Sequence, residues 1–412
     1  MMYDISSGKS KSLNQLAIEA QSKHDIGVTK QGIDKKFNDH ALIFLKRLLE
    51  KQLSVELNQQ IESRLLSFFN RVIIKDGTRF DLPAEYKEHL RGSGGSASEA
   101  GACLQFEFDL KNGHIIALNL TSANRPDVKD AIEVMDSIEK GDLIIRDLGY
   151  YAFQSFLNIV DKGAFFLSRL RPKANVFEMK SGKLQILDFK SVYNGMKRHN
   201  QSCIYKDVFI GTTIKLPVRL VIELLPDDVY QERMRKIQKL HKKKGRHTSE
   251  KYKFLSRFNI FITNVPIESL PDEVISSLYR IRWQVELVFK IWKSVIGIHH
   301  TSKMKYKRWL CLLHFKLLIM VINWNIIMTQ RNHVYKWRGK LLSLNKCFKT
   351  LFDNSRRLRD AIKLGIRGIE KYVAWSSKIL NKNHWLEKKK NNKGLEEIPF
   401  IIFCQSNEYA YI

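Results

Sequence analysis

The sequence predicts an α/β protein in which helices pack against one mixed β-sheet. The first observation is an alternation of apolar and polar residues, typical of strands, in several segments between residues 66 and 170. The second is helical periodicity at 127–138 and 151–162, between the later strands. The order strand, strand, strand, helix, strand, helix, strand is typical of helices packed on a mixed sheet. The strand segments are 71–82, in which the strand runs into a turn, 103–110, 114–123, 142–147 and 164–170.

A group of shorter strand segments interrupts this pattern after residue 170. They precede a strongly basic stretch, Arg233–Lys253, and a strand-like run, Phe258–Pro266, that resumes the sheet. We therefore expect a mainly β insertion at residues 171–257. Its strand-like pieces are 183–189, 207–214 and 217–225.

Both ends of the chain are predicted to be helical. Within the first 65 residues one helix breaks near Asp25–Gly27, and Thr29 is a suitable N-cap for the next. This outline fits a DNA-contacting helix-turn-helix, although a plain helical hairpin has the same outline. The expected regions are a helical DNA-binding part (1–65), a sheet domain (66–170 and 258–330), the β-rich basic insertion (171–257) and a helical C-terminal region with dimerisation as a candidate role (331–412).

The chain is strongly basic. Its 70 Lys and Arg against 42 Asp and Glu leave a net charge of +28, with a pI near 9.8. An excess of this size indicates a polyanionic partner, and it favours nucleic acid over a membrane surface or a ribosome. The hydrophobic content of 44% excludes a disordered chain.

Cysteine usage and the apolar pattern predict a cytoplasmic protein with no membrane partner. The five cysteines lie far apart and form no CxxC pair, as in a reducing compartment. The N-terminus lacks the apolar core of a signal peptide. The stretch Trp309–Met328 is nearly long enough to span a bilayer, but His314 and Lys316 within it favour a buried helix.

Two aspartates are expected at one end of the sheet. Asp76 precedes Gly77, where the first strand is expected to end, and Asp147 ends the fourth strand segment. These two strands can be neighbours in the sheet, and Glu286 would reach them from a helix packed over that edge. Three carboxylates without soft ligands suit Mg²⁺ or Mn²⁺. A pair of such ions catalyses phosphodiester transfer.

The helix predicted at Tyr279–Lys293 has two contrasting faces. With about 100° per residue, one stripe of the helix is apolar and suited to burial. The opposite stripe carries a single carboxylate among cations, and we expect the cations to contact phosphates. The members of this polar stripe are Tyr279, Arg282, Glu286, Lys290 and Lys293.

Each of the three acids also has a purely structural explanation. An Asp at a strand end is often a turn former, which applies to Asp76 and Asp147. Glu286 with Arg282 and Lys290, four residues on either side, would form an ordinary ladder of salt bridges. The order of the acids on the expected sheet favours the metal site.

The motifs around these acids resemble one family of bacterial transposases. Tyr279, Arg282, Glu286 and Lys293 fit the Tyr-Arg-Glu-Lys (YREK) spacing of the DDE enzymes of the "insertion sequence four" type. The blocks DGTRFDLP and IIRDLGYYAF resemble those with the first and second catalytic aspartates, and FITNVP resembles the segment before the signature. The resemblance covers roughly residues 12 to 330.

This resemblance implies a fold and a reaction. The fold would be ribonuclease-H-like, a mixed sheet with helices on both faces and a β insertion. Asp76, Asp147 and Glu286 would be catalytic and would ligate Mg²⁺, two ions in number, with Mn²⁺ able to substitute. The enzyme would cut the ends of its insertion sequence through a hairpin intermediate and join the 3′ ends to double-stranded target DNA. Tyr279, Arg282 and Lys293 would hold phosphates, and the protein would act as a homodimer on DNA in a bacterial cytoplasm.

Other residues are assigned to DNA with an alternative open. A near-continuous run of cations in the insertion is expected on the DNA backbone, although such a run is often only a solvated face. Phe258 lies beside Asn259, which aligns with a Trp that stacks on a flipped base in relatives, so Phe258 is either a stacking or a core residue. The cations of the run are Lys242, Lys243, Lys244 and Arg246.

Two other functions remain open at this point. One is a ribonuclease-H-like nuclease or resolvase that cleaves without strand transfer, which the YREK spacing and the insertion disfavour. The other is a catalytically silent DNA-binding protein descended from a transposase. The presence of all three acids argues against loss of the site.

Overall fold

A ten-stranded mixed sheet forms the centre of the computed structural model, which describes residues 11–55, 66–133, 135–243, 245 and 247–386. The strand order is β3-β2-β1-β4-β5-β10-β9-β8-β6-β7. β4 pairs in parallel with β1 and β5, and the other neighbouring pairs are antiparallel. The strands are β1 (Val72–Leu82), β2 (Ala100–Asp109), β3 (His114–Ser122), β4 (Leu143–Arg146), β5 (Phe165–Arg169), β6 (Val176–Lys180), β7 (Lys183–Ile186), β8 (Cys203–Ile210), β9 (Leu216–Leu224) and β10 (Phe258–Thr263).

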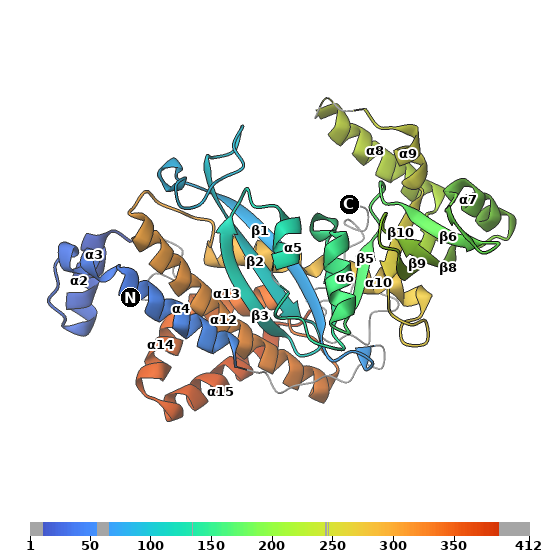
Figure 1. Cartoon of the computed structure of the whole chain (residues 1–412). Helices are drawn as coiled ribbons and strands as arrows, with labels where there is room; N and C mark the ends of the chain where they lie inside the picture. The colour runs from blue at the N-terminus through green and yellow to red at the C-terminus, as the bar shows by residue number, and fades with distance from the viewer. Residues whose placement is uncertain (1–10, 56–65, 134, 244, 246, 387–412) are drawn as a thin grey trace.

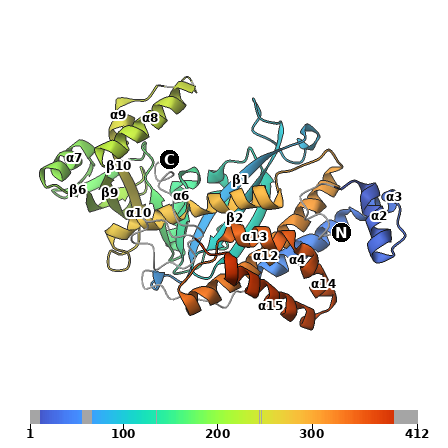
Figure 2. The same ribbon diagram turned by 180° about the vertical axis from the view of Figure 1, so that it is seen from behind.

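Helices cover both faces of this sheet, as the sequence predicts. α5 and α6 lie in front of it in Figure 1, and α10 and α13 lie in front in the opposite view of Figure 2. The helices are α2 (Leu13–His24), α3 (Lys30–Lys36), α4 (Asp39–Leu53), α5 (Asp127–Glu133), α6 (Phe153–Asp161), α7 (Phe189–Arg198), α8 (Asp227–Lys243), α9 (Glu250–Leu255), α10 (Asp272–Ile281), α11 (Gln284–Ile291), α12 (Tyr306–Arg338), α13 (Leu344–Asp353), α14 (Ser355–Lys363) and α15 (Ile366–Asn383). Short 3₁₀ turns are η2 (Ala84–Tyr86) and η3 (Leu148–Tyr150), and η4 (Trp292–Ile296) is a π-helical turn.

The alternation of the strands divides the core between the two faces. Val72 and Ile74 of β1 join the large cluster under α10 to α13, whereas Ile73 joins the cluster under α6. In β4, Ile145 faces the first cluster and Ile144 the second. Side chains alternate along a strand. The faces of these apolar residues therefore determine the face of each polar residue that follows them in β1 and β4.

One strand boundary differs from the prediction. Asp76 was expected at the end of the first strand, but β1 continues through it to Leu82. β2 pairs with β1 over this whole length, from Ile73 to Leu82. Gly77 permits this, because a Cβ there would lie only 3.0 Å from Gln105 Oε1 and 3.2 Å from Tyr150 Oη. Asp76 is therefore a mid-strand residue.

The insertion is built into the same sheet. β8 and β9 lie beside β10, and β6 and β7 complete the edge. Three helices, α7, α8 and α9, accompany these strands, so the segment is mixed and not only β. α8 and α9 project from one end of the molecule, opposite to α2 and α3 (Figure 1).

The apolar stretch within Trp309–Met328 is part of α12, a helix of 33 residues. Its most apolar window is long and hydrophobic enough to cross a membrane, but 72% of that window is buried in the fold. Trp324 is fully buried, and its indole N–H donates to the carbonyl of Gly113 over 2.7 Å. The prediction of a buried core helix agrees with this packing. α12 also runs without a break across position 330, where the sequence suggested a boundary.

The N-terminal helices are docked on α12. Thr29 caps α3 as expected, accepting a hydrogen bond from the backbone N–H of Gly32. Asp34 of α3 forms ion pairs with Lys305 (2.6 Å) and Arg308 (3.3 Å) at the start of α12. These contacts hold the N-terminal helices against α12 and thus against the sheet domain.

Candidate active site

The first two acids lie on adjacent parallel strands. β1 and β4 are paired so that Lys75 is opposite Arg146, which places Asp76 and Asp147 at the same level one residue later. Asp147 follows the last residue of β4, as predicted, and its side chain accepts from the backbone N–H of Gly149. By alternation both aspartates lie on the face that α10 and α11 cover.

The third acid comes from a broken helix. A continuous helix was expected over Tyr279–Lys293, but α10 ends at Ile281 and α11 begins at Gln284. At the break the bonds are of the tighter i→i−3 kind, from the N–H of Arg282 to the carbonyl of Tyr279 (3.1 Å) and likewise between Glu286 and Trp283 (3.1 Å). After α11 the chain widens into the π-helical turn η4.

Arg282 joins the three acids. Its Nη1 lies 2.9 Å from Asp76 Oδ2, and its Nη2 lies 3.6 Å from both Asp147 Oδ1 and Glu286 Oε1. The Arg282 side chain is 10% exposed, whereas those of Asp147 and Glu286 are 45% and 42% exposed. The cation therefore lies between a half-buried Asp76 and two acids that remain open to solvent.

The electrostatics of the site follow from burial and from this cation. Burial raises the pKa of Asp76 to about 6, against the opposing effect of Arg282. Burial also raises the pKa of Glu286, again opposed by Arg282. For Arg282, burial lowers the pKa, but Asp147 and Asp76 outweigh this and raise it. The single positive charge of the guanidinium thus does not neutralise the three carboxylates.

The donor set fits a hard divalent cation. Asp76, Asp147 and Glu286 offer only carboxylate oxygens, which Mg²⁺ and Mn²⁺ prefer. In the described part of the chain no three acidic, His or Cys side chains are close enough to hold an ion together. Arg282 lies between the three acids, so a bound ion would require the guanidinium to move.

The family of the chain follows from sequence comparison. A family model described as "Transposase DDE domain" matches residues 67–323, more than half of the chain and the whole sheet with its insertion. The chain belongs to the DDE transposase family. As a member, this transposase is an enzyme of the class that cleaves DNA and transfers its strands, and that class depends on divalent metal ions. The mixed α/β sheet is consistent with the ribonuclease-H-like fold of such enzymes.

Similar proteins cover most of the transposase. It is 31% identical to the transposase for insertion sequence element IS231F of Bacillus thuringiensis subsp. israelensis, over 91% of this chain and 82% of that protein. The transposase for IS231C of Bacillus thuringiensis subsp. berliner is 30% identical over 91% and 82% of the two chains. The transposase for IS1151 of Clostridium perfringens is 27% identical over 82% and 75%.

The other residues of the polar stripe differ in exposure. Tyr279 is buried, donates to the carbonyl of Arg146 over 3.4 Å, and has its pKa raised to about 12 by burial. Lys290 is exposed, with its ammonium 5.5 Å from the centre of the Trp283 ring. Lys293 donates to the carbonyl of Arg79 over 3.0 Å. The polar stripe is only partly exposed, because the helix break turns its first residues into the protein.

The basic run of the insertion lies on α8 and the turn after it. Lys242 and Lys243 are exposed at the projecting end of α8. Lys244 and Arg246 lie outside the described residues. Figure 1 and Figure 2 show this end of α8 away from the sheet, so the transposase does not bring these lysines to the three acids.

Phe258 is a core residue in this structure. Its side chain is 2% exposed and packs against Phe254 and Tyr193. Asn259 is bonded to Glu223 (2.7 Å) and Arg233 (2.7 Å). Phe258 was interpreted as either a base-stacking or a core residue, and its packing in this structure is that of a core residue.

Two buried cations behind the acids were missed by sequence reasoning. Lys75 and Arg146 directly precede Asp76 and Asp147 and point to the opposite face of the sheet. Lys75 Nζ lies 2.7 Å from Glu107 and 2.5 Å from Asp130, and both acids are buried. The available signal was a basic residue directly before each aspartate within otherwise apolar strands.

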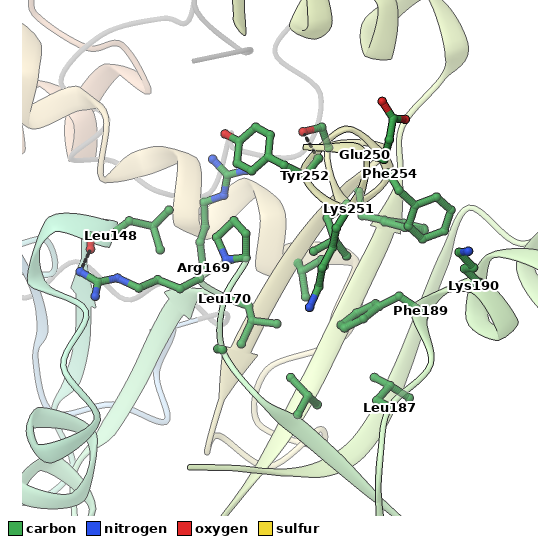
Figure 3. A pocket seen from close by; sticks show the side chains of 18 of the residues that line it. Leu148, Arg169, Leu170, Leu187, Phe189, Lys190, Glu250, Lys251, Tyr252 and Phe254 are labelled. Carbon is green, nitrogen blue, oxygen red and sulfur yellow. Dashed lines mark hydrogen bonds between the residues drawn. The ribbon is translucent and has the colours of Figure 1, made fainter. Parts of the chain in front are cut away.

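A cavity of about 910 Å³ lies beside Asp147. Figure 3 shows Leu148, the residue after Asp147, on one side of it and Phe254 on the other. Arg171 also lines the cavity and donates to the carbonyl of Leu148 over 3.1 Å. No single sequence motif marks this cavity, because the sheet domain and the insertion both line it.

Proposed function

We propose that this transposase moves its insertion sequence by a cut-and-paste reaction of the "insertion sequence four" type. The observation that carries the proposal is the convergence of Asp76, Asp147 and Glu286 on Arg282, at the level where two parallel strands are paired. The YREK spacing adds Tyr279, which is buried against the carbonyl of Arg146, and Lys293 to the proposed site. The similar transposases belong to insertion sequences, which supports an element end as the substrate.

The three acids would hold divalent metal ions, with Mg²⁺ as the proposed ion, Mn²⁺ as a substitute and two ions as the proposed number. When bound, such ions activate the attacking oxygen and stabilise the leaving oxygen of a phosphodiester. The half-buried Asp76 and the more exposed Asp147 and Glu286 are open to solvent on one side, where a DNA strand would approach.

The reaction we propose proceeds by successive exchanges at phosphorus. Water cleaves one strand at the element end and frees a 3′-hydroxyl. That hydroxyl attacks the opposite strand, so that one phosphodiester forms as another breaks and a hairpin results. Water reopens the hairpin, and the 3′-hydroxyl then attacks target DNA. In each step one P–O bond forms as another breaks: the two water steps leave a hydroxyl and a phosphate, and the two attacks by the 3′-hydroxyl replace one phosphodiester by another. No oxidant or reductant is needed.

Basic side chains would position the DNA. Lys290 and Lys293 extend from the acids along α11 and η4, where they would contact phosphates of the cleaved strand. Tyr279 and Arg282 would fix the phosphate nearest the acids. Lys242 and Lys243, with Lys244 and Arg246, would bind flanking backbone without reading sequence. We also propose that α2 and α3 contact the element end and that two protomers pair on two ends.

The test uses the DNA that flanks the gene. Purified protein is incubated with labelled end fragments in Mg²⁺, in Mn²⁺ and without metal, beside Glu286→Gln. Metal-dependent nicking followed by a hairpin-sized product, absent from the variant, is the expected result. Glu370→Gln changes an exposed carboxylate on α15 in the same way and should cleave normally. Binding of the ends without any product would contradict the proposal and indicate a silent DNA-binding protein.

A further inference from the structure

Arg282 occupies the centre of the site that the divalent ions require. Its guanidinium is within 4 Å of an oxygen of each acid, at 2.9, 3.6 and 3.6 Å. The side chain is almost wholly enclosed, and its Nε has no hydrogen-bond partner among the residues that the structure describes. The acids are therefore arranged around a monovalent cation supplied by the chain itself.

A divalent ion and this guanidinium compete for the same oxygens. Mg²⁺ holds its ligands at about 2.1 Å and demands a regular octahedron, so it would lie close to the nitrogen atoms that now contact those oxygens. Two like charges so close together repel each other strongly where water is scarce. Full ligation of an ion by the three acids requires that Arg282 give up at least part of its contacts.

The backbone around Arg282 restricts how it can leave. Tight bonds run from its own N–H to Tyr279 and from the N–H of Val285 to its carbonyl, both 3.1 Å. The neighbouring residues Ile281 and Val285 are fully buried. The base of the side chain is thus held, and only rotation about its side-chain bonds moves the guanidinium.

A phosphate can replace the three carboxylates as the partner of the Arg282 guanidinium. Arginine binds phosphate through two parallel hydrogen bonds, which replace its contacts with carboxylates at little cost. The proposed function brings a DNA phosphate to the side of the acids that is open to solvent. The lysines at positions 290 and 293 are on the same side of the helix and would stabilise that phosphate in its place.

We propose that Arg282 couples the binding of divalent ions to the binding of DNA. In the free protein the guanidinium neutralises Asp76, Asp147 and Glu286, and it weakens ion binding. When DNA binds, a phosphate takes the guanidinium and the acids become available to the ions. By thermodynamic linkage, bound ions strengthen DNA binding by the same factor. The inference rests on the proposed function, because it assigns the acids to the ions.

The experiment measures Mn²⁺ binding directly. Free Mn²⁺ is followed by electron paramagnetic resonance during titration of the full-length protein, alone and with a pre-cleaved end duplex whose 3′ terminus lacks its hydroxyl. No reaction can occur on this duplex, so binding is separated from cleavage. The variants are Arg282→Ala and Arg282→Lys, and the control is Arg280→Ala. Arg280 is exposed on α10 and bonds only to the nearby Ser276 and Ser277 among the contacts that the structure describes.

In the native chain we expect DNA to tighten Mn²⁺ binding about tenfold or more, which is within the usual range for coupled sites. Arg282→Ala should bind Mn²⁺ about tenfold more tightly without DNA and should lose the coupling, since its acids lack a resident cation. Arg282→Lys cannot span three carboxylates and should fall between the two. Arg280→Ala should behave as the native chain.

Two results would overturn the inference. One is equal Mn²⁺ affinity of the native chain with and without DNA. The other is a folded Arg282→Lys protein whose Mn²⁺ affinity equals that of the native chain. This second variant tests the inference even if Arg282→Ala does not fold. Coupling that is measured in a protein that never cleaves end fragments would support the role of Arg282 and contradict the proposed reaction. The two proposals therefore fail in different assays.

Discussion

Lys316 illustrates how one buried side chain affects the site from a distance. Its ammonium donates to the carbonyl of Gly297 over 2.7 Å, at the end of the π-helical turn that follows α11 and contains Lys293. A cation is favourable at such a helix end, because carbonyls there lack partners. Burial lowers the pKa of Lys316 to about 8, so the charged form is costly in the folded protein.

The stability of the protein should depend on pH through Lys316. Its pKa is about 8 when folded and near 10.5 when unfolded, so the unfolded chain binds more protons between these values, and stability rises with pH there. The free-energy cost of holding Lys316 in its charged form in the folded protein is fully present below pH 8. We expect Lys316→Met to raise the free energy of unfolding by roughly 1–2 kcal/mol at pH 7, after the loss of one hydrogen bond.

Thermal melting of Lys316→Met and the native chain between pH 7 and pH 10 checks this expectation. The advantage of the variant should shrink as the pH rises. Lys336→Met, at an exposed position of the same helix, should differ little from the native chain at any pH. A constant difference between Lys316→Met and the native chain over the whole range would contradict the assignment of the cost to the charge.

At the scale of elements, β1 and β4 carry two of the three candidate acids on one face and buried structural cations on the other. Asp76 and Asp147 point to α10 and α11, while Lys75 and Arg146 point to α5 and α6. Arg146 donates to the carbonyl of Ala131 (3.2 Å) and to Ser155 (3.1 Å), which ties both helices to β4. The packing behind the sheet therefore fixes the strands from which the acids project.

Loss of the buried cation in β1 should be strongly destabilising. Lys75→Met would leave Glu107 and Asp130 buried without their partner, and such a change costs about 3–5 kcal/mol. Urea unfolding followed by circular dichroism measures it. Lys87→Met breaks an exposed pair with Glu99 (3.1 Å) and should cost less than about 1 kcal/mol. Similar losses of unfolding free energy in the two variants would show that burial of the ion pairs of Lys75 with Glu107 and Asp130 does not cause the destabilisation.

At the scale of the whole molecule, the positive charge is spread over surfaces far from the acids. α8 and α9 project from one end of the molecule, and α14 and α15 lie near the other (Figure 1). The last turn of α8 carries Lys242 and Lys243, while its acids, Asp227, Asp228 and Glu232, lie in its first two turns. Such a separation favours contact of one end of α8 with a DNA backbone.

The α8 lysines should contribute a salt-dependent part of DNA binding. Each phosphate contact adds about 0.9 to the slope of log K against log salt. We therefore expect the double variant Lys242→Gln, Lys243→Gln to lower affinity for any duplex and to reduce the slope by about 1.8. Fluorescence anisotropy at several salt concentrations measures both.

A control separates local contact from net charge. The double variant Lys363→Gln, Lys371→Gln removes the same charge from α14 and α15 and should leave the slope nearly unchanged. An equal reduction by both variants would mean that net charge, and not α8, governs binding.

The sequence predicted the sheet, its helices and the three acids because each depends on local patterns. Alternation identified β1 and β4, and Thr29 marked the start of α3. The end of the first strand was placed wrongly, because an Asp-Gly pair normally turns and only the pocket formed by Gln105 and Tyr150 makes glycine a strand residue here. The break at Arg282 was also missed, since a helical wheel assumes one uniform period.

By itself, the sequence determined which residues of this protein can do chemistry: a spaced set of acids and cations on strands and helices of known period. The tertiary structure decided how they meet. It paired β1 with β4, turned Arg282 inward among the acids, and joined the strands of the insertion to the sheet. These features depend on contacts between residues far apart in the chain, and local propensity contains no information on such contacts.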